Sequence, residues 1–441
     1  MSSEWPRVSL RDFADLLAGF AFKSSGYTEN SQDVRLLRGD NIAPGRVRWD
    51  GVKRWPKNCG GDLAKYALQP GDVVLAMDRP WIPAGLKVAQ TTEIDTPSYL
   101  VQRVARLRAG SGADCDFLFS LLSAPEFESY IQNATTGTAV PHISAKQILN
   151  YEFRLPPASV RAEVGSLLAA INNRITLLRE TNTTLEAIAQ ALFKSWFVDF
   201  DPVHAKMQGR APEGMDEATA DLFPDSFEES ELGAVPKGWR VMPIGDAVET
   251  VGGATPDTKA PAYWEPAEHH WTTPKDLSGI ASPVLLGTER KLSDAGLKKI
   301  SSGLLPVGSL VMSSRAPIGY LAMTQVPMAI NQGYIAIPPG GKLSPVYMLF
   351  WCQTNMGSIK GRANGSTFME ISKKAFRPIP ALVPSQAVLD AFEAVTTQLF
   401  ARLVENEKQA QSLASIRDAL LPRLISGQLS LSEAQAIAES V

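Results

Sequence analysis

The sequence is poor in the residues that build disulfide frameworks and metal sites. Of 441 residues only three are cysteine, Cys59, Cys115 and Cys352, and only four are histidine. The cysteines are isolated and odd in number, which does not indicate a disulfide framework. The histidines show no ligand spacing beyond the adjacent pair His269 and His270. We therefore expect no metal to be bound by this chain.

Long apolar runs are also missing. No stretch of 18 apolar residues free of charge occurs, and the residues after Met1 lack the basic and then apolar pattern of a leader. We therefore expect neither membrane spanning nor secretion, and a cytoplasmic location. With 44% apolar and 20% charged residues, the composition is that of a globular protein with an ample core.

Motifs for bond-breaking chemistry are absent as well. There is no G-x-x-x-x-G-K-[ST] phosphate loop, no glycine-rich dinucleotide fingerprint, and no Ser-His-Asp or paired-carboxylate constellation. No Asn or Asp precedes a Pro-Pro-aromatic run, the motif with which amino-methyltransferases grip a flipped base. We expect a chain that is not an enzyme and binds no cofactor itself. An enzyme with an unrecognised catalytic domain stays as an alternative, against which these absences count.

A long heptad pattern between Val160 and Asp201 organises the chain. Apolar positions recur there with spacings of 4 and 3 residues without a slip, and only one of the ten is polar. The spacing predicts a helix with a coiled-coil seam. Roughly 40 helical residues make a rod of about 60 Å. The seam positions are Val164, Leu168, Ile171, Ile175, Leu178, Asn182, Leu185, Ala189, Leu192 and Trp196.

A second such stretch lies 228 residues later, from Ala387 to Ser426. Laid antiparallel so that paired residue numbers sum to 588, the two seams place Asn182 against Asn406. A lone polar pair in an apolar seam fixes the register of two helices. The second seam comprises Phe392, Thr396, Leu399, Leu403, Asn406, Ala410, Leu413, Arg417, Leu420 and Leu424.

The repeat extends upstream of the helices. TGTAVPHIS from Thr136 matches NGSTFMEIS from Asn364 at the same offset, and GDVVLAM from Gly71 matches GSLVMSS from Gly308 at an offset of 237. The chain is therefore an internal duplication. We predict an α+β fold with two mixed α/β lobes and two long helices that form an antiparallel coiled coil. In the first lobe we expect one helix over residues 116–134 and a capping box of Ser144 with Gln147.

Charge separates the lobes from the helices. Residues 1–155 carry 18 basic and 17 acidic side chains, and residues 236–383 carry 15 and 9. Residues 156–235 carry 6 and 13, and residues 384–441 carry 4 and 7. The acid thus gathers on the helices and on the segment from Asp199 to Glu231, which we expect to be a surface connector with little regular structure. The basic clusters of the lobes suit phosphate contacts, although a solvated face is an equally ordinary explanation.

Three stretches resemble a known family. The run FKSWFVDFDP from Phe193 with His204, ELGAVPKGW from Glu231, and LLPRLISGQL from Leu420 are similar to the conserved regions of the specificity subunit of type I restriction-modification systems. The resemblance implies two target-recognition domains that read the two halves of a split DNA sequence. It implies the boundaries 1–157 and 236–384 for these domains, 158–200 and 385–426 for the spacer helices, 201–235 for a central acidic connector and 427–441 for a C-terminal tail.

The same resemblance implies the partners and cofactors. The chain would bind double-stranded DNA and two modification (methyltransferase) subunits, and with them the restriction (endonuclease and translocase) subunits. S-adenosylmethionine, ATP and Mg would be held by those partners and not by this chain. A helical scaffold that binds proteins without reading DNA stays as the alternative function, against which the charge separation and the two-lobed repeat count mildly.

Groove readout needs Arg or Lys for guanine and Asn or Gln for adenine, and this choice of side chains gives the candidate DNA contacts. In the first lobe they are Arg38, Asn41, Arg46, Arg48, Lys53, Arg54, Arg79, Thr136, Gly137, Thr138 and His142. In the second lobe they are Lys275, Arg290, Lys291, Arg315, Arg362, Asn364, Gly365, Ser366 and Thr367.

Four aromatic residues at the end of the first rod exceed what one seam can bury. We predict that some of Phe193, Trp196, Phe197 and Phe200 dock a modification subunit, with packing in the core as the alternative.

Overall fold

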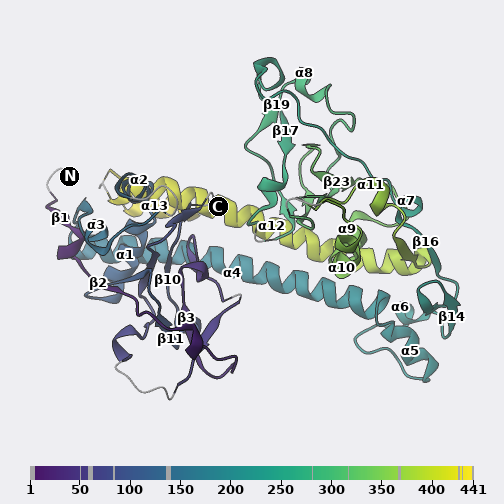
Figure 1. The fold of residues 1–441 in the computed structure, drawn as a ribbon, viewed down its shortest axis with the longest axis horizontal. Helices are drawn as coiled ribbons and strands as arrows, with labels where there is room; N and C mark the ends of the chain where they lie inside the picture. Colours follow the sequence, from purple (N-terminus) through teal and green to yellow (C-terminus); the bar gives the residue numbers. More distant parts are fainter. Residues whose placement is uncertain are drawn as a thin grey trace. The chain divides into compact units, whose positions relative to one another are not determined.

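The chain folds into two compact units. The computed structural model describes residues 5–49, 51–57, 63–82, 85–135, 141–280, 282–315, 317–365, 369–425, 428–429 and 431–439 (Figure 1). Unit 1 comprises Met1–Leu177 and Gln409–Val441, and unit 2 comprises Leu178–Lys408. Each unit is therefore a lobe together with a length of both long helices, α4 (Ala158–Phe197) and α12 (Gln386–Ile425).

Unit 1 is built around a four-stranded sheet in the order β10-β7-β12-β2. These strands are Val88–Gln90, Val73–Ala76, Val104–Ala109 and Ala14–Ala18. A three-stranded sheet, β11-β3-β6, holds Ser98–Leu100 parallel to Val34–Leu37, with Lys53–Trp55 antiparallel on the other side. Smaller pairs are β1 with β13 (Arg7–Ser9, Glu152–Arg154), β4 with β5 (Ile42–Ala43, Arg46–Val47) and β8 with β9 (Trp81–Ile82, Gly85–Leu86).

Unit 2 repeats this plan. Its four-stranded sheet β18-β21-β20-β23 consists of Val284–Leu285, Leu321–Thr324, Leu310–Ser313 and Tyr334–Ile337. Its three-stranded sheet β19-β17-β22 again has one antiparallel and one parallel neighbour, with strands Lys291–Leu292, His269–Thr272 and Ala329–Ile330. The pair β16 with β24 (Arg240–Pro243, Pro380–Val383) corresponds to β1 with β13.

The central strands β7 and β20 align the two lobes residue by residue. Each follows a turn whose glycine has positive φ, 89° at Gly71 and 81° at Gly308. The Gly71 N–H donates to the Thr91 carbonyl at 2.8 Å, and the Gly308 N–H donates to the Thr324 carbonyl at 2.8 Å. Only glycine adopts such a conformation without strain. The internal duplication predicted from the sequence is therefore present in the fold.

The helix predicted over residues 116–134 is wrong as a single element. Two helices stand there, α1 (Gly112–Leu122) and α2 (Pro125–Ala134), with Pro125 at the start of the second. Proline lacks the N–H that a continuous helix needs, but it suits the first helical position. Unit 2 breaks at the corresponding place, between α9 (Pro345–Thr354) and α10 (Met356–Gly361).

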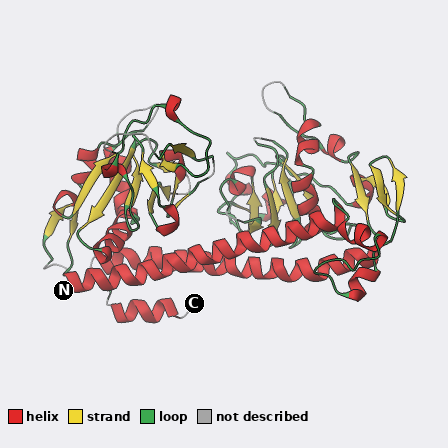
Figure 2. Ribbon diagram, turned by 90° about the horizontal axis from the view of Figure 1, so that it is seen from below, coloured by secondary structure: helices red, strands yellow, loops and turns green. Residues whose placement is uncertain are grey.

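The two long helices pair antiparallel within each unit, as predicted. In unit 1, Arg417 Nη1 donates to Asn172 Oδ1 at 3.0 Å. In unit 2, the rings of Trp196 and Phe392 lie 6.0 Å apart, and the side chains of Asn182 and Asn406 hydrogen-bond. Figures 1 and 2 show the two helices side by side in each unit, with the strands of that unit to one side of them. The α+β fold with an antiparallel coiled coil is thus confirmed.

Each lobe is fixed to its helix pair by close contacts. In unit 1 the Gly165 position of α4 lies so near α1 that a Cβ would meet the Ala113 carbonyl oxygen and the Phe117 nitrogen at 3.0 Å. Beside it, Arg161 Nε donates to Asp114 Oδ1 at 2.7 Å. The capping box of Ser144 with Gln147 is present at the start of α3 (Ala145–Leu149). Unit 2 has α11 (Lys373–Phe376) at the equivalent place, capped by Ser372.

The acidic segment after α4 is more ordered than expected. It forms α5 (Asp201–Met207), α6 (Glu217–Asp221) and a hairpin of β14 (Phe227–Ser230) with β15 (Gly233–Pro236). Val203, Phe223 and Val235 are 0%, 2% and 3% exposed in the main core of unit 2. The apolar residues scattered between the acids therefore fold this segment onto the lobe, because burying them stabilises it.

The remaining helices are short, except for the C-terminal one. They are α7 (Ile244–Ala247) and α8 (Asp294–Leu297) in unit 2, and α13 (Leu431–Glu439) near the C-terminus. No helix among the described residues is both long and apolar enough to cross a membrane.

Candidate nucleic-acid interface

A contact between an acidic and a basic residue closes the same junction in both lobes. After β7, Asp78 bridges His142, with His142 Nδ1 2.5 Å from Asp78 Oδ1. After β20, Arg315 bridges Glu370, with Arg315 Nη1 3.8 Å from Glu370 Oε2. The two pairs are equivalent in the repeat, but the acid and the base have exchanged places. Each pair joins the end of the central strand to the segment that leads into α3 or α11.

The polar loops predicted to contact DNA precede these junctions. Thr136, Gly137 and Thr138 lie outside the described residues, as do Ser366 and Thr367. The flanking positions are described in unit 2, where Asn364 and Glu370 exchange two backbone hydrogen bonds of 2.9 Å. Gly365 follows with φ of 135°, a conformation that favours glycine.

The basic candidates of unit 1 fall into paired and unpaired groups. Arg38 is paired with Asp40 at 2.7 Å, and Lys53 with Glu29 at 3.6 Å. Arg54 Nη1 donates to the Asp33 carbonyl at 2.9 Å, and Arg46 also has a partner. Among the described residues, the exposed side chains of Arg48 and Arg79 make no ion pair and no hydrogen bond. Arg79 also has a positive φ of 45°, an uncommon conformation that a functional site can retain.

Asn41 uses its amide inside the lobe. The residue is 4% exposed, its Oδ1 accepts the Arg38 N–H at 3.1 Å, and its Nδ2 donates to the Arg48 carbonyl at 3.0 Å. Both ends of the Asn41 amide are thus engaged inside the lobe, and its contact with a base stays a prediction. Asn41 braces the segment that carries Arg48.

The basic candidates of unit 2 also fall into an engaged group and an unpaired group. Arg290 stacks over Trp264 and Trp271, with its guanidinium carbon 4.0 and 4.8 Å from the ring centroids. Lys275, Lys291 and Arg362 have no ion pair or side-chain hydrogen bond in the part of the chain that the structure describes. Among the basic candidates of unit 2, these three are therefore available to an anionic ligand.

Two equivalent positions at which basic residue types face one another were not among the predicted site residues. In the three-stranded sheets Arg35 faces Arg54, and His270 faces Lys291. Burial lowers the pKa of Arg35, Asp95 opposes this, and Arg54 lowers it further. Burial also lowers the pKa of His270, and Lys291 adds to the effect. The guanidinium group of Arg35 donates to the Ile94 and Thr96 carbonyls and lies over the Trp49 ring, so it is held inside the lobe.

A third missed residue is Lys87, which is only 9% exposed. No sequence signal distinguishes it, since it lies in the run GLKVAQ between Gly85 and Gln90 with no basic neighbour. Arg35 and His270 could have been found by aligning the strands VRLL and HHWT of the two repeats.

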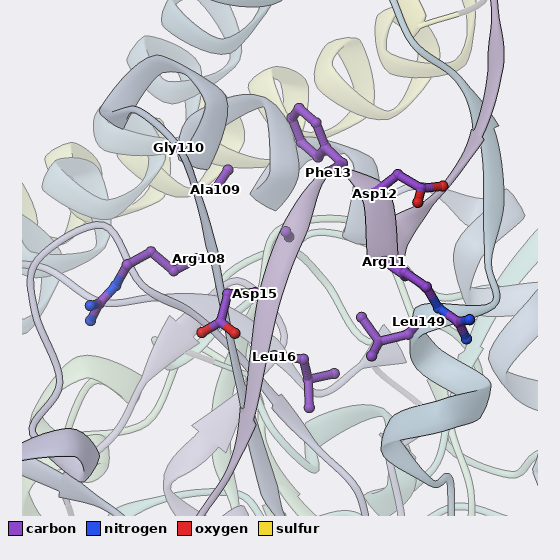
Figure 3. Close-up of a pocket in the computed structure, with 10 residues that line it drawn as sticks. Arg11, Asp12, Phe13, Asp15, Leu16, Arg108, Ala109, Gly110 and Leu149 are labelled. Atoms are coloured by element: carbon purple, nitrogen blue, oxygen red, sulfur yellow. The ribbon is translucent and has the colours of Figure 1, made fainter.

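An open hollow of about 690 Å³ lies beside the edge strand β2 in unit 1 (Figure 3). Its charged side chains are already engaged: Arg11 with Asn150, Asp15 with Arg106, and Arg108 with Asp72. Hydrogen bonds from Ser9 lower the pKa of Asp12, which lies on the rim. None of the residues predicted to contact DNA lines the hollow. Its lining is Arg11, Asp12, Phe13, Ala14, Asp15, Leu16, Arg108, Ala109, Gly110 and Leu149.

The adjacent histidines do not act together. His270 Nδ1 accepts the Thr288 N–H at 3.1 Å, whereas His269 Nε2 lies 2.7 Å from Asp294 Oδ1. His269, Asp294 and Glu268 have ligand atoms within 4.8 Å of one another and could hold a cation. Two of the three are exposed at the surface, where such groups commonly stand without a metal.

Three of the four aromatic residues predicted to dock a partner lie in the core. Phe193, Trp196 and Phe197 are 2%, 5% and 6% exposed. Phe197 packs against Tyr347 and Phe392 with ring centroids 5.0 Å away in each case. Core packing, the alternative expected for these residues, explains their burial. Phe200 is half-buried and is the member of the set that retains an accessible edge.

Comparisons with known proteins found a matching family model and similar chains. Residues 236–399 match the family of the type I restriction modification DNA specificity domain. Over these residues the chain is therefore similar to the DNA specificity domain of type I restriction-modification systems. It is 26% identical over 413 residues to the HindI type I restriction enzyme specificity subunit of Haemophilus influenzae, which covers 83% of this chain and 88% of that relative.

Other members of the family are similar over a shorter length or in fold. The MjaIX specificity subunit of Methanocaldococcus jannaschii is 34% identical over 189 residues, which cover 42% of this chain and 43% of that one. The crystal structure of the type I restriction-modification S subunit from M. genitalium superposes with a TM-score of 0.52 at 15% identity, over 96% of each chain. At 15% identity this similarity shows that the two chains share a fold.

Proposed function

We propose that this chain is the DNA-specificity subunit of a type I restriction-modification complex. Each lobe reads one half of a bipartite site in double-stranded DNA, and the paired helices set the unread spacer between the halves. The chain itself is not catalytic. It docks two modification subunits, which bring restriction subunits into the complex, and it acts in the cytoplasm.

The repeat-equivalent junction carries this proposal. Asp78 with His142 and Arg315 with Glu370 join the same two elements in the two lobes, but the acidic residue stands first in unit 1 and second in unit 2. Two copies of one scaffold that present different side chains at the same place suit the reading of two different half-sites. Direct readout depends on which donors and acceptors meet the base edges, so exchanging them on a fixed scaffold alters the sequence read.

The unpaired cations support contact with DNA phosphates. Arg48 and Arg79 in unit 1, and Lys275, Lys291 and Arg362 in unit 2, have no acidic partner among the described residues. Phosphate contacts position a protein on the duplex, and they make its affinity fall steeply with salt. A scaffold that binds only proteins has no need of unpaired cations in both lobes.

S-adenosylmethionine, ATP and Mg belong to the partner subunits in this proposal.

Filter binding of the chain with its modification partner to random duplex tests the proposal. We expect log affinity to fall linearly with log salt concentration, with a slope of about −0.9 for each phosphate contacted. A matched variant with Arg48 and Arg79 changed to Gln should lower the slope by about two, because two phosphate contacts are removed. Binding without any salt dependence would identify the chain as a protein scaffold.

A further inference from the structure

Lys87 is a buried cation without a partner. It lies between β9 and β10, and its residue is 9% exposed. Its ammonium group makes no hydrogen bond and no ion pair with any residue that the structure describes. Most of the side chain is out of water, but Nζ is not one of the fully buried unpaired atoms of the described residues. An anionic ligand can therefore reach the ammonium, and pairing with it would offset the cost of desolvation.

The backbone around Lys87 holds its ammonium beside two further cations. The Lys87 N–H donates to the Pro80 carbonyl at 2.6 Å, which places Lys87 next to Arg79. On the other side, a Cβ built on Gly39 would lie 3.9 Å from Lys87 Nζ. Two residues from Gly39, Asn41 holds the Arg48 backbone through bonds of 2.7 and 3.0 Å.

The acid that acts on Lys87 is Asp40, which is also paired with Arg38. Asp40 pairs with Arg38 at 2.7 Å, and its side chain is 81% exposed. Burial lowers the pKa of Lys87, Asp40 opposes this, and Arg48 and Arg79 lower it further. Lys87 therefore shares its surroundings with two further cations and with Asp40, which also serves Arg38. An anionic group would complete the neutralisation of the three cations.

We propose that Lys87, with Arg48 and Arg79, forms a binding site for a phosphate group in unit 1. The Lys87 ammonium is a compact cation that can pair with the oxygens of a phosphate group, and Arg48 and Arg79 can add further donors to the same group. The source of the phosphate rests on the proposed function: it is a backbone phosphate of the DNA half-site that this lobe reads. Asn41 is a positioning residue in this site, because it holds Arg48.

The second lobe does not repeat the site. The Ala76 N–H of β7 donates to the Lys87 carbonyl at 3.0 Å, and the equivalent Ser313 N–H of β20 donates to the Tyr320 carbonyl at 2.9 Å. Tyr320 therefore occupies the position of Lys87 in unit 2. A neutral phenol there cannot replace the ammonium, so this phosphate anchor is particular to the first lobe.

The test compares Lys87→Met with Lys23→Met in the full chain co-purified with its modification partner. Methionine keeps the unbranched shape of lysine and removes its charge, and Lys23 is an exposed lysine of the same unit. For Lys87→Met we expect a rise in Tm of about 2–4 °C, because a buried unpaired charge is removed. We also expect roughly tenfold weaker binding to duplex and a salt slope reduced by about one. Lys23→Met should leave Tm and the salt slope near their wild-type values.

Inorganic phosphate serves as the probe that does not depend on DNA. At constant ionic strength, phosphate should raise the Tm of the wild type and of Lys23→Met by more than that of Lys87→Met. If phosphate stabilises all three equally and Lys87→Met keeps the wild-type salt slope, the site does not exist. If the phosphate effect is lost in Lys87→Met but the wild type shows no salt-dependent DNA binding, the anion site stands and the proposed function falls. A lower Tm for Lys87→Met with unchanged DNA binding would show a structural lysine and overturn the inference.

Discussion

Asn406 Nδ2 donates to Asn182 Oδ1 at 2.9 Å inside the helix pair of unit 2. The two residues are 0% and 2% exposed, and Asn182 Nδ2 donates in turn to the Leu403 carbonyl at 3.1 Å. Asn406 Oδ1 has no hydrogen-bond partner among the described residues. An incompletely satisfied polar pair in an apolar seam adds little stability, but it penalises every other register.

Substitutions at this pair should separate stability from register. Asn182→Leu alone leaves the buried Asn406 amide without its acceptor, and we expect a loss of about 1–3 kcal/mol in the free energy of unfolding. The double variant Asn182→Leu with Asn406→Leu removes both polar groups and should recover that loss. Urea unfolding measures both. A double variant as unstable as the single one would show that the pair contributes to stability directly.

The contact of Arg161 with Asp114 should make the stability of unit 1 depend on pH. Burial raises the pKa of the Asp114 carboxyl, but hydrogen bonds from Arg161 and Ser111 outweigh this effect and hold that pKa below its usual value. A lowered carboxyl pKa stabilises the fold above the unfolded pKa of about 3.9, and this stabilisation is lost as the pH falls through the folded pKa. Asp114→Asn should therefore cost about 1.5–3 kcal/mol at pH 7, and less at pH 3.

The exposed pair of Arg7 with Glu152 provides the control for that measurement. Its side chains are 73% and 55% exposed, so Glu152→Gln should change the stability by less than about 1 kcal/mol at either pH. If Asp114→Asn shows the same loss at pH 7 and pH 3, the charge of Asp114 is not the cause.

Phe197 and Phe200 should respond differently to truncation. Phe197→Ala leaves a cavity between Tyr347 and Phe392, with an expected loss of about 3–5 kcal/mol. Phe200→Ala removes an edge contact with Phe227 and Trp239 and should cost less. If Phe200 docks a modification subunit, its variant should lose co-purification of that subunit while urea unfolding changes little. Full co-purification would exclude Phe200 from the docking surface.

Exchanging the first lobe should change only half of the recognised sequence. The duplication gives each lobe its own sheets and core, so residues 1–157 from another family member should replace one half-site. Mapping methylated adenines in a genome that carries the chimeric chain and its methyltransferase measures this. A simultaneous change in both half-sites would contradict independent readout.

Matched insertions in the two long helices should lengthen the unread spacer. Four residues inserted next to Asn182 in α4, without an insertion in α12, break the register of the helix pair. Four residues added to both helices at paired positions keep the seam and extend it by about 6 Å. We expect the single insertion to abolish methylation and the matched one to shift it to sites with a longer spacer. An unchanged spacer after the matched insertion would contradict a measuring role for the helices.

The sequence by itself determined the duplication, the two helices and their register. Heptad spacing is a local property of the chain, and an antiparallel pairing with residue sums of 588 is the arrangement that brings Asn182 opposite Asn406. The capping box at Ser144 was equally readable, because its partner Gln147 lies three residues away. The predicted helix over residues 116–134 failed because the pattern gave no weight to Pro125.

Only the tertiary structure decided which charged side chains lack a partner and which aromatic side chains are exposed. His142 contacts Asp78, which is 64 residues away in the sequence. Arg315 contacts Glu370 across a segment that contains β21, β22, β23, α9 and α10. The burial of Lys87, and of Phe197 beneath Tyr347, likewise depends on segments that are remote in the sequence. Ion pairing and desolvation are set by neighbours in space, so no local pattern could separate the engaged cations from the available ones.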